Sequence, residues 1–161
     1  MSKPAAFKIF SAKTAEDLEA VKRLFRAYVD WLEIDLSYQG FEEELAGMPG
    51  KYAPPQGALY LAKRTNGEVL GCVGLRPFGE EGACEMKRLY VSPKARGLGV
   101  GAALVDSVLR AAREAEYAVM LLDTLPTMTG AIKLYTNAGF EETSAYYETP
   151  IRETVFFRKH L

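Results

Sequence analysis

The stretch from residue 91 to residue 102, VSPKARGLGVGA, constrains the fold more than any other part of the chain. It joins a segment that alternates like a strand to one with helical periodicity. The glycines at 97, 99 and 101 permit a tight turn, and the first N–H groups of the following helix have no partners inside it. These donors and the helix dipole favour an anionic ligand, and Arg96 adds a positive charge beside them. The pattern therefore predicts a phosphate-binding loop between a strand and a helix.

Two familiar nucleotide sites fit this loop poorly. A nucleotide P-loop is excluded because no Gly-Lys-Ser/Thr follows the glycines. A dinucleotide fold matches formally through Gly97-x-Gly99-x-x-Ala102, and the next strand ends at Asp123, where a ribose-binding acid is expected. However, residues 92–96 separate the strand from the glycines, and about 60 residues follow the motif, too few for a doubly wound sheet. This alternative stays open but is disfavoured.

Composition narrows the class of protein further. The 161 residues correspond to a single domain over 1–161, and 48% hydrophobic residues suffice for a core. The net charge of −1 provides no basic field for nucleic acid, and no apolar run approaches the length that spans a bilayer. Two cysteines and one histidine do not make a disulfide framework or a zinc site. We expect a cytoplasmic protein without a metal, a membrane anchor or a nucleic-acid partner.

The hydrophobic pattern predicts an α/β or α+β domain around a mixed sheet. Thr14 and Asp17 resemble a capping box before the first helix, and Asn66-Gly67 is a strong hairpin pattern. Strict alternation over 83–91 would place Glu85, Lys87, Leu89 and Val91 on one face. The expected strands are 6–10, 58–63, 69–76, 83–91, 117–123, 140–144 and 153–158, and the expected helices are 18–32, 40–47, 100–114 and 129–137.

Two motifs together resemble the GNAT superfamily of N-acetyltransferases. The first runs from Leu89-Tyr-Val91 through Pro93 to Arg96-Gly97-x-Gly99-x-Gly101, which is similar to the family's pyrophosphate loop. The second, Ala131-x-x-Leu134-Tyr135-x-x-x-Gly139-Phe140, is similar to its A-x-x-L-Y-x-x-x-G-F motif. The resemblance implies a GNAT-like, mostly antiparallel central sheet of about seven strands flanked by about four helices.

The resemblance also implies acetyl-CoA as co-substrate. Its pyrophosphate is expected on the backbone amides of the loop, and its pantetheine arm on the edge of the preceding strand, in a splay toward 120–123. A backbone N–H near Leu89 would polarise the thioester carbonyl. The expected CoA-binding residues are Leu89, Tyr90, Val91, Arg96, Gly97, Leu98, Gly99, Val100, Gly101 and Ala102.

Two residues are candidates for proton transfer. Tyr135 resembles the family's general acid, which protonates the leaving CoA thiolate; as a core aromatic it would instead only pack. Glu85 lies six residues before Val91, where some members carry a catalytic glutamate, and is the candidate base. The alternative for Glu85 is a strand carboxylate paired with Lys87 or Arg76.

Two further positions qualify the resemblance. Met128 stands where the family often has an asparagine that contacts the pantetheine or a water, and Thr127 or Thr129 are candidates to replace it. Cys84 as the nucleophile of a covalent acetyl-enzyme is disfavoured, because no histidine lies near it in the sequence to activate it. Direct transfer in a ternary complex is therefore expected.

The acceptor is expected to be a primary amine, preferably on a small molecule. By the resemblance it is bound by residues 31–55 and 146–150, which are rich in aromatic and acidic side chains that suit a cationic amine. A non-catalytic acyl-CoA sensor is the alternative function, and packing aromatics with a solvated helix face are the alternative for the expected acceptor region. The oligomeric state stays open, and the resemblance implies that a homodimer through the last strands is possible. The residues of this expected acceptor region are Tyr28, Trp31, Glu33, Asp35, Tyr38, Phe41, Glu42, Glu43, Glu44, Tyr52, Tyr146, Tyr147 and Glu148.

Overall fold

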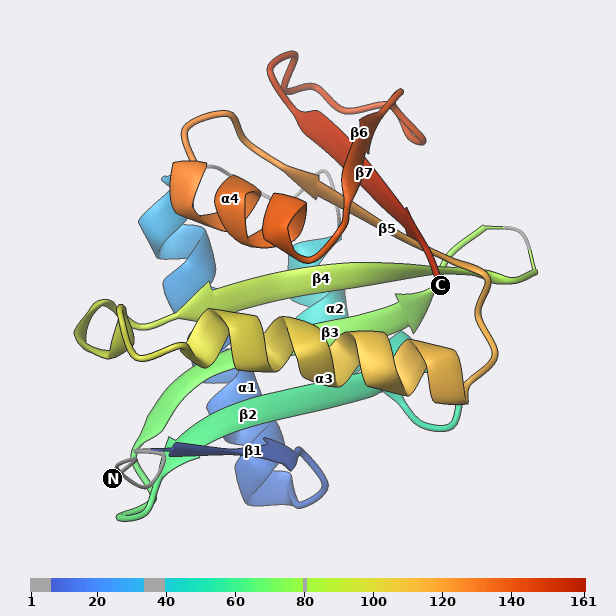
Figure 1. The fold of residues 1–161 in the computed structure, drawn as a ribbon. Helices are drawn as coiled ribbons and strands as arrows, with labels where there is room; N and C mark the ends of the chain where they lie inside the picture. The colour runs from blue at the N-terminus through green and yellow to red at the C-terminus, as the bar shows by residue number, and fades with distance from the viewer. Residues whose placement is uncertain (1–6, 34–39, 80) are drawn as a thin grey trace, which may run out of the picture.

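The computed structural model describes residues 7–33, 40–79 and 81–161. Their strands form one sheet with the order β1-β2-β3-β4-β5-β7-β6 (Figure 1). β4 and β5 run parallel, and all other neighbouring pairs run antiparallel. The strands are β1 (Phe7–Ser11), β2 (Ala58–Arg64), β3 (Val69–Pro77), β4 (Ala83–Val91), β5 (Val119–Thr124), β6 (Glu141–Thr143) and β7 (Val155–His160).

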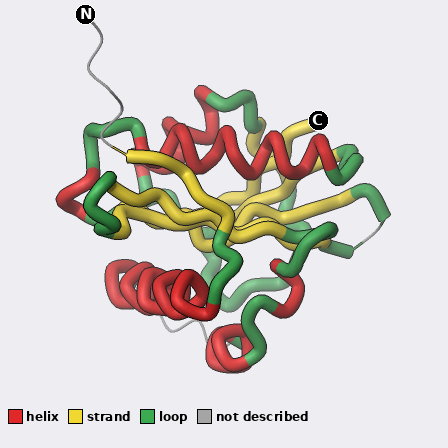
Figure 2. Tube along the Cα trace, turned by 90° about the horizontal axis from the view of Figure 1, so that it is seen from below, coloured by secondary structure: helices red, strands yellow, loops and turns green. Residues whose placement is uncertain are grey.

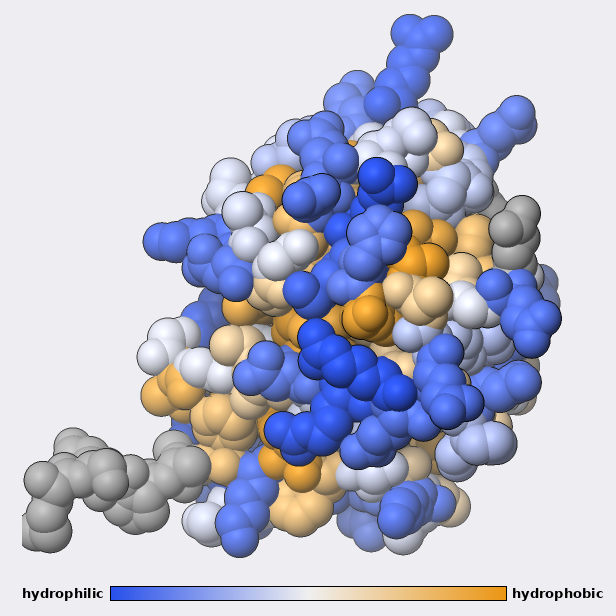
Figure 3. Space-filling view, turned by 45° about the vertical axis from the view of Figure 1, so that its right-hand side comes forward, coloured by the Kyte–Doolittle hydropathy of each residue, from blue (hydrophilic) through white to orange (hydrophobic). Residues whose placement is uncertain are grey.

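Helices cover both faces of this sheet, so the protein has three layers (Figure 2). Helix α1 (Ala15–Leu32) and the short α2 (Phe41–Ala46) pack on one face, around Phe25, Leu61 and Tyr90. Helices α3 (Val100–Glu114) and α4 (Thr129–Asn137) pack on the other. This confirms the predicted mixed, mostly antiparallel seven-stranded sheet with four helices in the part of the chain that the structure describes. Figure 3 shows that hydrophilic side chains cover much of one outer surface, with apolar patches between them.

Local sequence explains where most elements begin and end. The Thr14 hydroxyl accepts from the Asp17 amide and the Asp17 carboxylate accepts from the Thr14 amide, which confirms the capping box. Gly67 closes the β2–β3 hairpin at φ 88°, and Gly139 follows α4 at φ 95°. Between α2 and β2, a 3₁₀ turn (Gly50–Tyr52) interrupts the expected loop and buries Tyr52.

Two strands start later than the hydrophobic pattern predicts. The Tyr117 amide donates to the Ala112 carbonyl at the end of α3, so β5 starts at Val119 rather than at residue 117. The Thr154 amide and hydroxyl both donate to the Ile151 carbonyl, and this turn delays β7 to Val155. In both places a turn hydrogen bond competes with the sheet ladder for the same backbone groups.

A β-bulge in β4 overturns the predicted alternation. Gly74 pairs with Lys87 while Cys72 pairs with Tyr90, so β4 has one residue more than β3 between these pairs. Arg88 takes up the extra residue with φ 60°. As a result, Leu89 packs with the α3 core, on the face opposite to the side chains of Glu85 and Lys87. The expectation that Glu85, Lys87, Leu89 and Val91 share one face is therefore wrong.

β4 and β5 separate just before the bulge. Their parallel pairing covers only three residue pairs and ends at Glu85 and Leu121. β4 nevertheless continues to Val91 and β5 to Thr124. The backbone edges of the two strands thus open into a fork, and its mouth faces the start of α3 and the start of α4 (Figure 1).

Candidate active site

The glycine loop lies at one end of this fork and presents backbone donors. A 3₁₀ turn (Pro93–Ala95) leads into it, and Gly97 and Gly99 adopt left-handed conformations with φ 85° and 84°. A methyl group added at either glycine would meet no other atom within 4 Å, so the backbone there is open to a ligand. Within the described residues, the amides of Gly99 to Ala102 donate to no backbone carbonyl and no side chain caps the helix. This cradle fits a diphosphate.

Arg96 is held beside the cradle by an aromatic ring. Its guanidinium lies over Trp31, with Cζ 4.9 Å from the ring centroid. Trp31 in turn packs against Tyr90, with ring centroids 6.1 Å apart. The stack links the end of α1 to the loop and to β4. Because the planar guanidinium keeps its edge free while it stacks, Arg96 can still bind a phosphate.

A groove runs from the loop along β4 to α4. Nine of the ten residues predicted from the sequence to bind CoA line it: Leu89, Tyr90, Val91, Arg96, Gly97, Gly99, Val100, Gly101 and Ala102. The exception, Leu98, is exposed and does not line the groove. Met128 lines it together with Thr127 and Thr129, so both threonines are available for the contact that the absent asparagine would make.

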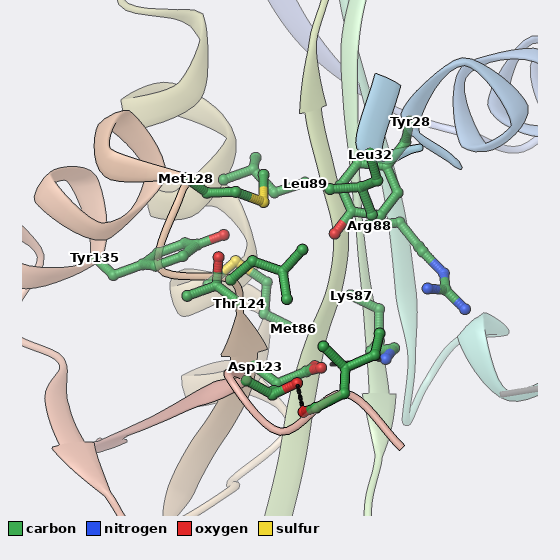
Figure 4. A pocket seen from close by; sticks show the side chains of 13 residues that line it. Tyr28, Leu32, Met86, Lys87, Arg88, Leu89, Asp123, Thr124, Met128 and Tyr135 are labelled. Carbon is green, nitrogen blue, oxygen red and sulfur yellow. Dashed lines mark hydrogen bonds and ion pairs between the residues drawn. The ribbon is translucent and has the colours of Figure 1, made fainter. Parts of the chain in front are cut away.

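The groove adjoins a cavity inside the fork, and Leu89 and Met128 line both spaces. Tyr135 points its hydroxyl into this cavity from α4, and Tyr28 points its own from the opposite side (Figure 4). Tyr135 is only 6% exposed, and its hydroxyl makes no hydrogen bond to any described residue. Burial raises the pKa of Tyr135 above its ordinary value, so the phenol keeps its proton at neutral pH.

Glu85 does not line this cavity, and both of its carboxylate oxygens accept hydrogen bonds from neighbouring side chains. The carboxylate is 1% exposed, and Arg76 donates to Oε1 from Nε at 2.9 Å and from Nη2 at 2.8 Å. The Tyr146 hydroxyl donates to Oε2 at 2.5 Å. Glu85 is therefore paired with Arg76, which is the alternative interpretation given above. The Glu85 carboxylate in this pair is buried rather than solvated.

Glu85 belongs to a cluster of buried charges around the fork. On its α2 side, Glu44 binds Arg88 through both carboxylate oxygens, at 3.2 and 3.4 Å, and lies 3.8 Å from Arg76. Figure 4 shows the Arg88 guanidinium directed away from the cavity. The acidic residue Glu44, expected to attract a cationic acceptor, is thus neutralised by arginines inside the fold.

Lys87 and Asp123 lie together at the cavity wall. The Lys87 Nζ is 3.7 Å from Asp123 Oδ1 and 3.9 Å from Glu85 Oε2. Burial is the main cause that lowers the pKa of Lys87, while the two carboxylates oppose this shift. The Tyr147 hydroxyl donates to Asp123 Oδ2 at 2.6 Å. Tyr146 and Tyr147 pack edge-to-face on each other and on Phe156, so an aromatic cluster holds both hydroxyls in place.

Sequence reasoning missed several residues of this cavity. Asp123 had been considered only as a ribose ligand of the disfavoured dinucleotide fold, and Lys87 only as a partner of Glu85. The position of Asp123 at the end of an apolar strand is a usable clue, but nothing in the sequence shows that β4 and β5 separate before Asp123 and leave it at the cavity. Asp35 and Tyr38, predicted for the acceptor region, lie outside the described residues.

Cys84 is a poor nucleophile in this structure. It is buried, its thiol lies 3.5 Å from the Val119 carbonyl, and burial raises its pKa to about 12. Among the described residues, no group of three or more His, Cys, Asp or Glu side chains is arranged to hold a metal ion. Nor does any helix in that part of the chain have the length and apolar character needed to cross a membrane.

Comparison with known proteins identifies the family. The model of the acetyltransferase (GNAT) family matches residues 18–140. An uncharacterized N-acetyltransferase of Schizosaccharomyces pombe is 41% identical over 158 residues, which cover 98% of this chain and 97% of the relative. The chain therefore belongs to the GNAT family and is an N-acetyltransferase.

Solved structures show the same fold. A Klebsiella pneumoniae protein described as an acyl-CoA N-acyltransferase superposes with a TM-score of 0.77 at 27% identity, over 98% of this chain and 99% of its own. An acetyltransferase from Salmonella typhimurium, whose structure includes its cofactor acetyl-CoA, gives a TM-score of 0.73 at 19% identity, over 96% of this chain and 94% of its own. GNAT acetyltransferases use acetyl-CoA, and the unpaired amides of the glycine loop suit its pyrophosphate.

Proposed function

We propose that this N-acetyltransferase moves the acetyl group of acetyl-CoA directly to a primary amine of a small molecule, in a complex that holds both substrates. The observation that carries the proposal is that the groove and the cavity adjoin, with Leu89 and Met128 in the lining of both. The unpaired amides of Gly99 to Ala102 lie at one end, and the free hydroxyl of Tyr135 lies at the other. A CoA with its pyrophosphate on the amides would extend its thioester toward Tyr135.

Each end of this path has a chemical task. The amides and Arg96 bind the pyrophosphate, and the edge of β4 at Leu89 to Val91 binds the pantetheine arm. Acetyl-CoA supplies an acetyl group activated as a thioester. Tyr135 protonates the departing thiolate, because its hydroxyl faces the cavity and burial keeps the phenol protonated at neutral pH.

Glu85 fits the role of base less directly than Tyr135 fits that of acid. Its carboxylate is engaged by Arg76 and Tyr146, so a proton from the acceptor would reach it only through another group. Direct transfer agrees with the buried, weakly acidic Cys84 thiol. Steady-state kinetics with both substrates varied should give intersecting lines, whereas parallel lines would indicate a covalent acetyl-enzyme.

The first test is substrate binding followed by turnover. Trp31, the only tryptophan in the chain, lines the groove, so acetyl-CoA should change its fluorescence. Thiol release is then measured with a panel of primary alkylamines, polyamines and α-amino acids. Binding followed by amine-dependent thiol release supports the proposal, while binding without release across the panel favours the alternative, an acyl-CoA sensor.

Tyr135→Phe tests the acid directly. We expect kcat to fall about 100-fold, which is typical of the loss of one proton-transfer group, with acetyl-CoA affinity unchanged. Tyr28→Phe is the matched control, since Tyr28 presents its hydroxyl to the same cavity. Equal losses in the two variants would contradict a specific role for Tyr135.

A further inference from the structure

We propose that Asp123, rather than Glu85, binds the acceptor's amine and takes its proton. The proposal deepens the amine transfer proposed above and rests on it. The sequence pointed to Glu85, and the fold brings Asp123 to the reacting end of the fork instead.

The backbone places Asp123 where an acceptor would meet the thioester. The last β5 residue paired with β4 is Leu121, so Asp123 lies two residues farther along, where the strands have separated. It lines the same cavity as Tyr135 and Leu89, and Figure 4 shows its carboxylate at the side of that cavity near Lys87. Glu85 is not among the residues that line this cavity.

One carboxylate oxygen of Asp123 is held and the other is available. Tyr147 donates to Oδ2 at 2.6 Å and so fixes the orientation of the group. Oδ1 has Lys87 Nζ at 3.7 Å, beyond hydrogen-bond distance, and accepts no hydrogen bond from a described residue. The Asp123 side chain is 15% exposed, compared with 1% for Glu85. An incoming ammonium can therefore donate to Oδ1 without displacing an existing donor.

The groups around Asp123 favour loss of the ammonium's charge. Lys87 Nζ from β4 lies 3.7 Å from the same carboxylate, and a protonated Lys87 makes a second cation at that place electrostatically unfavourable. The other titratable groups that face this region are Glu85 on β4, Tyr146 and Tyr147 from the segment before β7, Tyr135 on α4 and Tyr28 on α1.

The proton balance closes with groups already described. The ammonium passes one proton to Asp123 Oδ1, and the nitrogen lone pair then forms the N–C bond to the thioester carbon. The C–S bond breaks as the thiolate takes the phenolic proton of Tyr135. The second proton that the nitrogen loses restores the Tyr135 phenol, and Asp123 releases its proton to water. The net products are the N-acetylated amine, CoA thiol and one proton.

The decisive comparison is Asp123→Asn against Glu85→Gln. The amine is the one that gives the fastest thiol release in the panel above, so that wild-type turnover establishes the proposed function first. We expect Asp123→Asn to lower kcat about 100-fold or more, with acetyl-CoA affinity within twofold of the wild type by Trp31 fluorescence. The fold-decrease in kcat caused by Glu85→Gln should be at least ten times smaller than that caused by Asp123→Asn. A larger loss in Glu85→Gln than in Asp123→Asn would overturn the proposal.

The pH dependence separates a base from a structural residue. The fold-decrease in kcat of Asp123→Asn relative to the wild type should become smaller as pH rises toward the ordinary pKa of an alkylamine, about 10. At that pH much of the amine is already neutral and needs no base to remove its proton. A deficit that stays constant with pH contradicts the proposal.

Tyr147→Phe provides a second variant that does not depend on how Asp123→Asn folds. It removes the hydrogen bond that orients the Asp123 carboxylate. We expect kcat at neutral pH to fall several-fold, with acetyl-CoA affinity within twofold of the wild type. An unchanged kcat in Tyr147→Phe would also overturn the proposal.

Discussion

The two ends of the proposed substrate path are built in opposite ways. The CoA end uses backbone amides from one short segment, residues 96–102, in which Gly97 and Gly99 are open to solvent. The acceptor end and the charge cluster behind it use buried and partly buried side chains from separate segments: Glu44 on α2, Arg76 on β3, Lys87 on β4, Asp123 on β5 and Tyr147 before β7. A site made of backbone in one segment can be recognised from sequence, whereas a site assembled from distant side chains requires the fold.

The difference also concerns stability. At the CoA end, the unpaired amides lie at the start of α3 and carry no net charge, so no buried counterion depends on them. At the acceptor end, the charges are buried and depend on one another, so removal of one partner leaves a charge without its counterion in a poorly solvated place. We therefore expect substitutions at the acceptor end to affect folding and those in the cradle to affect affinity.

The largest expected effect is on the Glu44–Arg88 pair. Glu44→Ala removes the carboxylate that binds buried Arg88 through two hydrogen bonds, and should lower the free energy of unfolding by about 3 kcal/mol. Glu42→Ala in the same helix is the control, because its pair with Arg26 is exposed and contributes less than about 1 kcal/mol. Urea unfolding measures both variants. Equal decreases in the free energy of unfolding would show that the Glu44–Arg88 pair contributes no more to stability than the exposed Glu42–Arg26 pair.

Arg96→Ala should act on affinity instead. Loss of a charged donor to the pyrophosphate should weaken acetyl-CoA binding about tenfold by calorimetry, with the unfolding midpoint nearly unchanged. Lys94→Ala removes a nearby exposed cation that pairs with Glu68 and should leave the affinity unaltered. The assignment of Arg96 fails if both variants bind acetyl-CoA as the wild type does.

Gly99→Ala has the smallest expected effect on stability. At φ 84°, a residue with a side chain is strained, so the substitution should lower the free energy of unfolding by about 1 kcal/mol. No atom lies within 4 Å of the added methyl group, so no steric clash contributes. Gly130→Ala, in α4 and equally uncrowded, should instead be neutral or slightly stabilising, as is usual inside a helix. Thermal unfolding distinguishes the two. A destabilisation of the same size in both would contradict the conformational explanation.

Much of this fold was predictable because its elements are locally determined. The α1 capping box, the Asn66-Gly67 hairpin and the helix that starts at Val100 depend on residues close in sequence. The strands that start late, β5 and β7, were predicted less well, because hydrogen bonds at Tyr117 and Thr154 close turns that hydrophobicity does not reveal. Tyr135 was found through its motif, and its orientation into the cavity became visible only in the structure.

By itself, the sequence determined the order of the elements, the glycine loop of residues 96–102 that leads into α3, and the family. Each of these depends on a contiguous pattern that short-range sterics and hydrogen bonding translate directly into structure. Only the tertiary structure decided which carboxylate faces the cavity. One extra residue at Arg88 changes the side-chain alternation along β4, and the early end of the β4–β5 pairing exposes Asp123. Both follow from how neighbouring strands pair, and strand pairing is set by contacts between residues far apart in the chain.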